Sequence, residues 1–266
     1  MQPTQEQKAA DFRALHEGEG FIIPNPWDAG SARVLEAFGF KALATTSSGF
    51  AFTLGRLDGN TTLDDVIAHV RALDRATSLP VSVDLENGYG PDPEVAASAI
   101  VRAAEAGAAG GSIEDYDPDA GIYELGHAAE RIAAASEVVR GFSFPFMLTA
   151  RAENHIRDNP DLDDTIARLQ AYERAGADVV YAPGLRTGDQ IRAVCEATTK
   201  PVNVLARPGL SLRQIVDAGA RRVSVGGALT WVAVGAMAAA VQRMRDDGDF
   251  SLLDVRVQIE DWLGDQ

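Results

Sequence analysis

The sequence predicts an α/β fold, a (β/α)8 TIM barrel that forms a single domain over residues 1–266. Three observations favour this fold. Eight short apolar runs alternate with helix-period segments, no break in composition divides the chain, and several helix-like segments end in an Ala-Gly-Ala stop. Glycine directly after a helix favours the left-handed cap that returns the chain to the next strand. The stops lie at Ala106–Ala108, Ala175–Ala177 and Ala218–Ala220.

The chain repeats one unit, in which a β-prone run is followed by a polar or small turn and then by a helix. The expected strands are Phe21–Pro24, Ala42–Ser47, Val81–Glu86, Gly111–Asp115, Phe146–Arg151, Asp178–Ala182, Val202–Ala206 and Arg222–Val225. The expected helices include Asp65–Ala76, Pro93–Ala106, Ala128–Val139, Asp163–Ala175, Asp189–Ala197 and Leu212–Ala218. A doubly wound open sheet shows the same alternation, but its glycine-rich first turn is replaced here by residues 24–28, Pro-Asn-Pro-Trp-Asp. The barrel is therefore the favoured fold.

Two helix-like segments follow the eighth unit, Trp231–Arg245 and Leu252–Leu263. Both carry apolar faces that one barrel does not need to cover itself. The members of these faces are Trp231, Val232, Val234, Met237 and Val241 in the first, and Leu252, Leu253, Val255, Val257, Ile259 and Leu263 in the second. We therefore expect residues 231–266 to be C-terminal oligomerisation helices of a homo-oligomer, a dimer or a tetramer.

Charge and composition exclude several classes of partner. The formal net charge of −15 disfavours nucleic acid and anionic membranes, because both would repel the protein. The single cysteine, Cys195, rules out an intramolecular disulfide and fits a reducing compartment. No signal peptide and no apolar run of about 20 residues is evident. A soluble, cytoplasmic protein is expected.

An acidic pair interrupts an otherwise apolar strand at Asp84 and Glu86. Residues two apart in a strand point to the same face, so the two carboxylates should lie together. Burying an unpaired carboxylate costs several kcal/mol, which favours a bound cation. Oxygen ligands suit Mg2+ or Mn2+ better than zinc. The alternative is a strand end whose acids are solvated in a turn.

Unusual polar residues follow the strands at their carboxyl ends, where barrel enzymes collect their chemistry. They are Thr45 to Gly49, Asp84 and Glu86, Glu114 and Asp115, Arg151, Glu153 and Asn154, Tyr181, and Asn203 with Arg207. Acids from adjacent strands, with an arginine and small hydroxyl residues beside them, predict a site for a cation and an anion. A structural ring of salt bridges is the alternative.

Five motifs in this order resemble those of the isocitrate lyase and phosphoenolpyruvate mutase superfamily, over about the range 21–245. The motifs are Ser48-Gly49-Phe50, Gly55-Arg56-Leu57-Asp58, Asp84-Leu85-Glu86-Asn87-Gly88-Tyr89-Gly90, Ile113-Glu114-Asp115 and Ala150-Arg151-Ala152-Glu153. Glu86 replaces an aspartate of the family pattern. The resemblance also implies that the last barrel helix is exchanged between subunits.

The resemblance implies a role for each matching residue. Asp84 would lie closest to Mg2+, with Asp58, Glu86 and Glu114 holding the waters of the metal. Ser48, Gly49 and Phe50 would bind the substrate carboxylate, and Arg151 would neutralise a 2-oxo acid or its enolate. Within the site predicted from the strand ends, Asn203 and Asp84 are further substrate-binding candidates. Catalytic candidates are Arg151, Glu114 and Tyr89, whose phenol could protonate an enolate.

The loop after the fourth strand departs from the family. Lyases carry a Lys-Lys/Arg-Cys-Gly-His sequence there, and enzymes of carbon–phosphorus chemistry use Lys and Asn, whereas residues 116–127 contain none of Lys, Asn and Cys. Cys195 lies on a helix-like segment away from this loop. Decarboxylation of an oxaloacetate-like acid needs little more than the metal and Arg151, so it is the leading prediction. Carbon–phosphorus chemistry, as in a mutase or a phosphonopyruvate hydrolase, and cleavage of a substituted malate stay as alternatives.

Further predictions concern the loop after the fourth strand and the turn after the last strand. In residues 116–127, proline and glycine flank acidic residues, and the apolar residues follow no helix or strand period. This pattern predicts a mobile lid that does not pack on the hydrophobic core. His127 is expected to be solvated at the start of the next helix. The glycine turn Val225–Ala228 could instead bind a phosphate, as in other barrels. A barrel that binds 2-oxo acids without catalysis is the last alternative.

Overall fold

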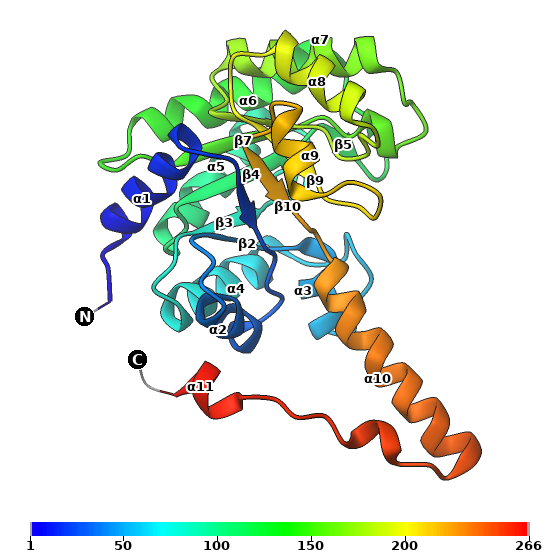
Figure 1. Ribbon diagram of the computed structural model, residues 1–266. Coiled ribbons are helices and arrows are strands. Elements are labelled where there is room, and N and C mark those ends of the chain that lie inside the picture. The colour runs from blue at the N-terminus through cyan, green and yellow to red at the C-terminus, as the bar shows by residue number, and fades with distance from the viewer. Residues whose placement is uncertain (1, 265–266) are drawn as a thin grey trace.

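The computed structural model describes residues 2–264. Eight parallel strands form its main sheet, in the spatial order β1-β10-β9-β8-β7-β4-β3-β2 (Figure 1). Their bounds are β1 Phe21–Ile23, β2 Leu43–Ala44, β3 Val81–Asp84, β4 Gly110–Glu114, β7 Met147–Arg151, β8 Val179–Tyr181, β9 Val202–Leu205 and β10 Arg222–Ser224. Each lies within or beside a predicted run, so the predicted (β/α)8 barrel is confirmed.

The first and second strands approach each other at the seam of the barrel, where side chains add to the backbone hydrogen bonds. The backbone N–H of Ala44 donates to the carbonyl of Pro24 at 3.1 Å. Asn25 donates from Nδ2 to the carbonyl of Thr45 at 2.9 Å, and its Oδ1 accepts the backbone N–H groups of residues 225 and 226. Asn25 therefore links β1, β2 and the turn after β10 at the carboxyl ends of these strands.

Helices surround the barrel strands. Those of the barrel and of its amino-terminal lead are α1 Gln5–Glu17, α2 Ala29–Ala37, α3 Ser47–Thr53, α4 Leu63–Ala76, α5 Pro93–Glu105, α6 Leu125–Arg140, η1 Asn154–Ile156, α7 Leu162–Ala175, α8 Gly188–Ala197 and α9 Leu212–Asp217. The three expected stops are confirmed, because Gly107, Gly176 and Gly219 all have φ between 107° and 109°. A side chain at φ near 107° would be strained, which explains the glycine.

Helix α1 packs against the amino-terminal ends of the strands, the floor of the barrel. Ala9 and Phe12 of α1 are buried in one cluster with Ile23, Met147 and Val179. Lys8 is also buried, and its Nζ lies 2.7 Å from Asp74 Oδ1. The carboxyl ends of the strands therefore form the opposite end of the barrel, which α1 leaves uncovered.

The carboxyl-terminal segment leaves the barrel. Helix α10, Ala228–Asp247, runs outward, and the chain then returns along η2, Ser251–Leu253, to α11, Ile259–Leu263, beside α2 (Figure 1). The predicted helix Trp231–Arg245 is confirmed, whereas the prediction of a helix over Leu252–Leu263 is wrong for most of its length. Among residues 2–264, no helix combines the length and the apolar character that a membrane span requires.

Candidate active site

Arg151, the last residue of β7, lies at the centre of a buried charged cluster. Its guanidinium contacts the Glu114 carboxylate, its Nη1 lies 3.5 Å from Asp84 Oδ2, and its Nε lies 3.0 Å from Glu153 Oε1. Burial alone would lower the pKa of Arg151, but the charges of Glu153 and Asp84 raise it above its usual value. Arg157, whose Nη2 lies 3.1 Å from Glu153 Oε2, is the second cation. Three carboxylates still outnumber two guanidinium groups.

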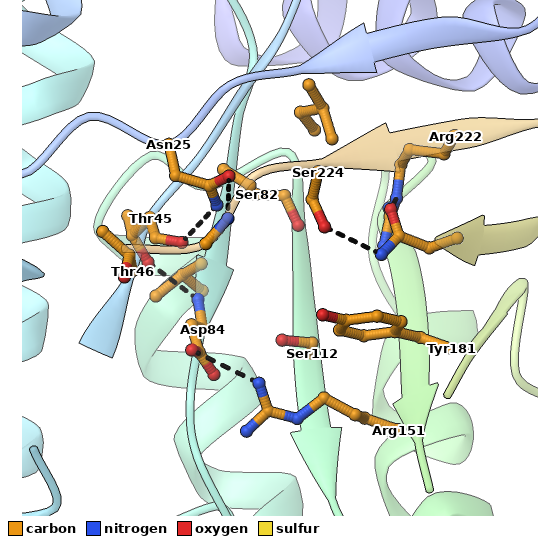
Figure 2. Close-up of a pocket in the computed structure, with 15 residues that line it drawn as sticks. Asn25, Thr45, Thr46, Ser82, Asp84, Ser112, Arg151, Tyr181, Arg222 and Ser224 are labelled. Carbon is orange, nitrogen blue, oxygen red and sulfur yellow. Dashed lines mark hydrogen bonds and ion pairs between the residues drawn. The ribbon is translucent and has the colours of Figure 1, made fainter. Parts of the chain in front are cut away.

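Arg151 lines two neighbouring cavities. The interior cavity, of about 60 Å³, lies among the strands, and Figure 2 shows the hydroxyl, amide and charged groups around it. The outer cavity, of about 200 Å³, lies under the loops. The interior cavity is lined by Ile23, Asn25, Ala44, Thr45, Thr46, Ser82, Val83, Asp84, Ser112, Arg151, Tyr181, Asn203, Arg222, Ser224 and Gly226. The outer cavity is lined by Ser47, Asp58, Gly59, Glu86, Glu114, Tyr116, Pro118, Arg151 and Arg157.

The loop after β3 holds the acidic pair in an unusual backbone conformation. Glu86 and Tyr89 have φ of 49° and 66°, in the left-handed region that costs an L-residue about 1–2 kcal/mol. The N–H of Glu86 donates to Asp84 Oδ1 at 3.2 Å. Burial, and then the charges of Asp84 and Asp58, raises the pKa of Glu86 to about 7. The fold therefore gathers these three acids at one mouth against their mutual repulsion.

Arg131 of α6 holds this loop from behind. It is 1% exposed, and its donors reach four backbone carbonyls: Pro91 at 2.9 Å, Gly90 at 2.7 Å, Glu114 at 3.2 Å, and Asn87. The ring of Tyr123 lies 4.5 Å from its guanidinium carbon. Burial lowers the pKa of Arg131 below its usual value. One side chain thus fixes the strained turn and the end of β4 relative to each other.

The acidic residues fit a divalent cation by their chemistry. All candidate donors are carboxylate oxygens, which Mg2+ and Mn2+ prefer. Glu114 Oε2 is buried and, although it contacts Arg151, forms no hydrogen bond of normal geometry with residues 2–264. In the same range no three acidic, histidine or cysteine side chains are close enough to ligate one ion. Mg2+ usually keeps several waters, so Asp84 as ligand, with Asp58, Glu86 and Glu114 holding waters, stays the prediction.

The residues expected to bind the substrate carboxylate lie on α3, beside the cavities. Ser48, Gly49 and Phe50 are not among the side chains that line either cavity. The N–H of Gly49 donates to Thr46 Oγ1 at 3.4 Å, and the ring of Phe50 stacks on His69 with centroids 4.0 Å apart. Their predicted role therefore requires the carboxylate to compete with the N-cap residue Thr46 for the N–H of Gly49.

Two other candidates have defined partners. The hydroxyl of Tyr89 lies 3.3 Å from Thr61 Oγ1, which also donates to Glu86 Oε1. Burial, and then the charge of Glu86, raises the pKa of Tyr89 well above its usual value, so its phenol stays protonated. Asn203 is 1% exposed, and its amide donates to Ser224 Oγ and accepts from Arg222 Nε.

The expected lid contains a two-stranded hairpin, β5 Tyr116–Asp117 and β6 Gly121–Ile122. The prediction that nothing in the loop docks on a core is wrong for Tyr123, which is 7% exposed and packs in the main core cluster. Helix α6 begins at Leu125, so His127 lies in its first turn. His127 is half-buried, its Nε2 lies 2.9 Å from the carbonyl of Pro91, and it lines neither cavity. Only residues 116–122 can therefore move as a lid without opening the core.

Three arginines of the site region were absent from the sequence-based candidates. They are Arg131, Arg157 and Arg222, none of which interrupts an apolar strand in its interior. Arg157 lies under the lid, with its guanidinium carbon 3.7 Å from the centre of the Tyr116 ring. The position of Arg157, six residues after Arg151 on the loop that follows β7, was the one available signal. Cys195, on α8, lines neither cavity, and burial raises its pKa to about 11.

Comparison with known proteins gives the family. Residues 12–245 match the phosphoenolpyruvate phosphomutase family. An oxaloacetate decarboxylase of a Bradyrhizobium species is 32% identical over 80% of this chain and 76% of its own. A crystal structure from Burkholderia cenocepacia, described in general terms as a lyase or mutase, is 50% identical with a TM-score of 0.95, covering 98% and 97% of the two chains.

A crystal structure of an oxaloacetate acetylhydrolase with its product oxalate is 25% identical, with a TM-score of 0.87 and coverage of 98% and 95%. The family match spans most of the chain, and the five motifs and the barrel agree with it. The chain therefore belongs to the phosphoenolpyruvate phosphomutase family, within the superfamily that also contains the isocitrate lyases.

Proposed function

We propose that this enzyme is a Mg2+- or Mn2+-dependent lyase that acts on a small 2-oxo acid through an enolate. Decarboxylation of an oxaloacetate-like acid is the reaction that we favour. The observation that carries the proposal is Arg151, buried among three carboxylates between a polar interior cavity and the acidic outer cavity. A related oxaloacetate decarboxylase supports the choice of reaction.

The residues of the chain can supply the polar steps. Loss of carbon dioxide from a β-keto acid leaves an electron pair on C3, which delocalises onto the 2-oxo oxygen. The guanidinium of Arg151, fixed by its ion pairs, provides donors for that oxygen. Tyr89 keeps its phenolic proton at neutral pH and would deliver it to C3. Water then returns a proton to Tyr89.

A bound Mg2+ would add positive charge beside the same oxygen. Asp84, Glu86, Glu114 and Asp58 are the residues that would hold it. Because Arg151 and Arg157 alone do not balance these acids, we expect an anionic substrate to bind only after the cation. The absence of Lys, Asn and Cys from residues 116–127 argues against the loop chemistry of mutases and of the usual lyases.

The test is a substrate screen with and without metal. Protein treated exhaustively with EDTA should be inactive, and Mg2+ or Mn2+ should restore pyruvate release from oxaloacetate above the metal-only rate. Phosphonopyruvate and substituted malates test the two alternative reactions. Asp84→Asn, which removes the charge of the proposed metal ligand, is the matched variant for the metal requirement. Full activity after EDTA treatment would contradict the metal requirement, and binding of oxalate without turnover of any 2-oxo acid would support a non-catalytic barrel.

We further propose that residues 231–266 assemble the enzyme into a homo-oligomer. Along α10 only Thr230 and Ala240 are buried, and apolar side chains stay exposed. They are Trp231, Val232, Met237 and Val241, followed by Phe250, Leu252, Leu253, Val255 and Val257. So much exposed apolar surface is typical of an interface. Light scattering at micromolar concentration should give a dimer or tetramer, and a monomer would contradict this.

A further inference from the structure

A buried arginine with no acidic partner lies at the floor of the barrel. Arg222 begins β10 and is 5% exposed. Its Nε donates to Asn203 Oδ1 at 2.9 Å, its Nη2 to Thr149 Oγ1 at 3.0 Å, and its Nη1 lies 3.4 Å from His16 Nε2. Each partner is neutral, and across residues 2–264 no carboxylate lies within 4.0 Å of this guanidinium. Burial lowers the pKa of Arg222 to about 10, so it is charged at neutral pH.

Arg222 and the active-site cluster share the interior cavity. Arg222, Asp84 and Arg151 all line it. In Figure 2 Ser224, Tyr181 and Ser112 lie between the two arginines, with Arg151 toward the carboxyl ends of the strands. The cavity, of about 60 Å³, has room for small polar groups, and its lining contributes few charges between the two guanidinium groups. Few charged groups of the cavity lining can therefore screen Arg222 from a ligand bound at Arg151.

We propose that Arg222 is an additional cation of the substrate site, which attracts an anionic ligand from the floor side of the cavity without contacting it. This inference rests on the proposed function, because it takes the ligand to be the dianion of a 2-oxo acid. Keeping an unpaired charge inside a barrel costs several kcal/mol in desolvation, and a hydrophobic side chain of similar size would avoid that cost. An anion bound at the mouth would offset this desolvation cost. Arg222 would then act as a positioning residue, because it does not contact the ligand.

The same charge has opposite effects on the two ligands of the site. It attracts the anionic substrate and repels the divalent cation that the mouth acids would bind. At a separation of about 10 Å and an effective dielectric constant of about 20, one pair of unit charges changes a binding constant by roughly tenfold. If Arg222 had a purely structural role, its replacement would loosen the barrel and weaken the binding of both ligands.

Calorimetry on four variants of the full chain tests the proposal. Arg222→Gln removes the charge but keeps a polar amide, and Arg222→Met removes the charge and the polarity, so one of them suffices if the other does not fold. Both should bind oxalate, at saturating Mg2+, at least about tenfold more weakly, and should bind Mg2+ alone at least about tenfold more tightly, because each ligand carries two charges. Arg222→Lys should stay near the wild type. Arg221→Met is the matched control, because Arg221 is the neighbouring arginine and donates outside the barrel to the carbonyl of Gly18.

Three results would overturn the proposal: Mg2+ affinity that falls together with oxalate affinity, unchanged affinities for both ligands, or equal changes in Arg221→Met. Failure of the proposed function gives a different pattern, in which the wild type itself binds no oxalate in the presence of Mg2+. In that case the metal measurement still decides, since Mg2+ affinity that does not rise when the charge of Arg222 is removed contradicts its electrostatic role.

Discussion

The two ends of the barrel each bury an arginine, but they stabilise it differently. At the mouth, Arg151 pairs with three carboxylates, and the acids remain in excess. At the floor, the partners of Arg222 among residues 2–264 are an amide, a hydroxyl and an imidazole. The mouth is therefore short of positive charge and the floor is short of negative charge. The difference indicates that the barrel is polarised along its axis, with ligands completing the charge balance at the mouth.

The largest effect that tests this comparison should come from Arg151→Lys. A lysine is a single point charge and cannot pair with Glu114, Glu153 and Asp84 together, as the fork of a guanidinium can. We expect kcat to fall on the order of a hundredfold to a thousandfold, the range for loss of a preorganised donor. Steady-state pyruvate release measures it. Arg222→Lys is the matched control, and an equal fall in kcat in this variant would contradict the difference between the mouth and the floor.

Arg131→Met sharpens the comparison, because the hydrogen-bond partners of Arg131 in the described part of the chain are backbone carbonyls, although it belongs to the mouth. Its removal leaves the carbonyls of residues 87, 90, 91 and 114 without their donor and frees the left-handed turn at Glu86. We expect a loss of about 3 kcal/mol in the free energy of unfolding, from buried hydrogen bonds to a charged group. Mg2+ affinity should fall at least about tenfold as the acids lose their positions.

The direction of the change in Mg2+ affinity distinguishes Arg222 from Arg131. Removing the charge of Arg222 should tighten Mg2+ binding, whereas removing Arg131 should weaken it despite the same change in charge. Calorimetric titration with Mg2+ and urea denaturation measure the two quantities. Tighter Mg2+ binding by Arg131→Met would show that charge, and not the turn, dominates its effect.

The segments that cover the two ends of the barrel differ as well. Deletion of Pro118–Gly121 tests the role of the hairpin at the mouth. A hairpin covers the mouth, whereas α1 packs permanently on the floor. Without the hairpin turn, water would reach the enolate and weaken the electrostatic stabilisation, so kcat should fall roughly tenfold. Because Tyr123 stays anchored in the core, melting temperature and oxalate affinity should change little. An unchanged kcat on the true substrate would show that the hairpin is only a connector.

The fold could be predicted from the sequence because its signals are local. Gly107, Gly176 and Gly219 mark helix ends by backbone conformation alone. The failed helix, Leu252–Leu263, shows the limit of that approach. Its apolar residues at 253, 255, 257 and 259 alternate with a period of two, and the structure has no helix between the end of η2 at Leu253 and Ile259. Its apolar face suggested an amphipathic helix, whereas the period of two argued against one.

The acids of the site were predictable and its supporting arginines were not. Asp84 and Glu114 interrupt apolar strands, so each signals a cost that some partner must offset. Arg131 lies in a helix and Arg222 at the start of a strand, two places where arginine is usually exposed. Their burial arises from tertiary contacts with segments far away in the chain, such as the partners Gly90 and His16. A single sequence does not encode those contacts locally.

The smallest expected effect concerns the floor and its dependence on pH. His16 Nδ1 lies 2.8 Å from the carbonyl of Phe12, and Nε2 faces Arg222 Nη1 at 3.4 Å. Both contacts are satisfied only by a neutral ring that donates from Nδ1 and accepts at Nε2. Burial, and then the charge of Arg222, lowers the pKa of His16 from 6.5 to about 3. Protonation would place a second cation beside Arg222.

The sign of the pH effect follows from linkage. Between pH 6.5 and about 3 the unfolded chain binds a proton at His16 that the folded protein does not, so this contribution to stability is complete above pH 6.5 and declines as pH falls. In His16→Gln that loss is absent, and the slopes of the two stability curves should differ by up to about 1.4 kcal/mol per pH unit. Urea denaturation at pH 7, 6 and 5 measures this before most carboxylates titrate. Parallel curves would mean that folded His16 accepts a proton, and that a negative group, such as an anion bound at the floor, already balances Arg222.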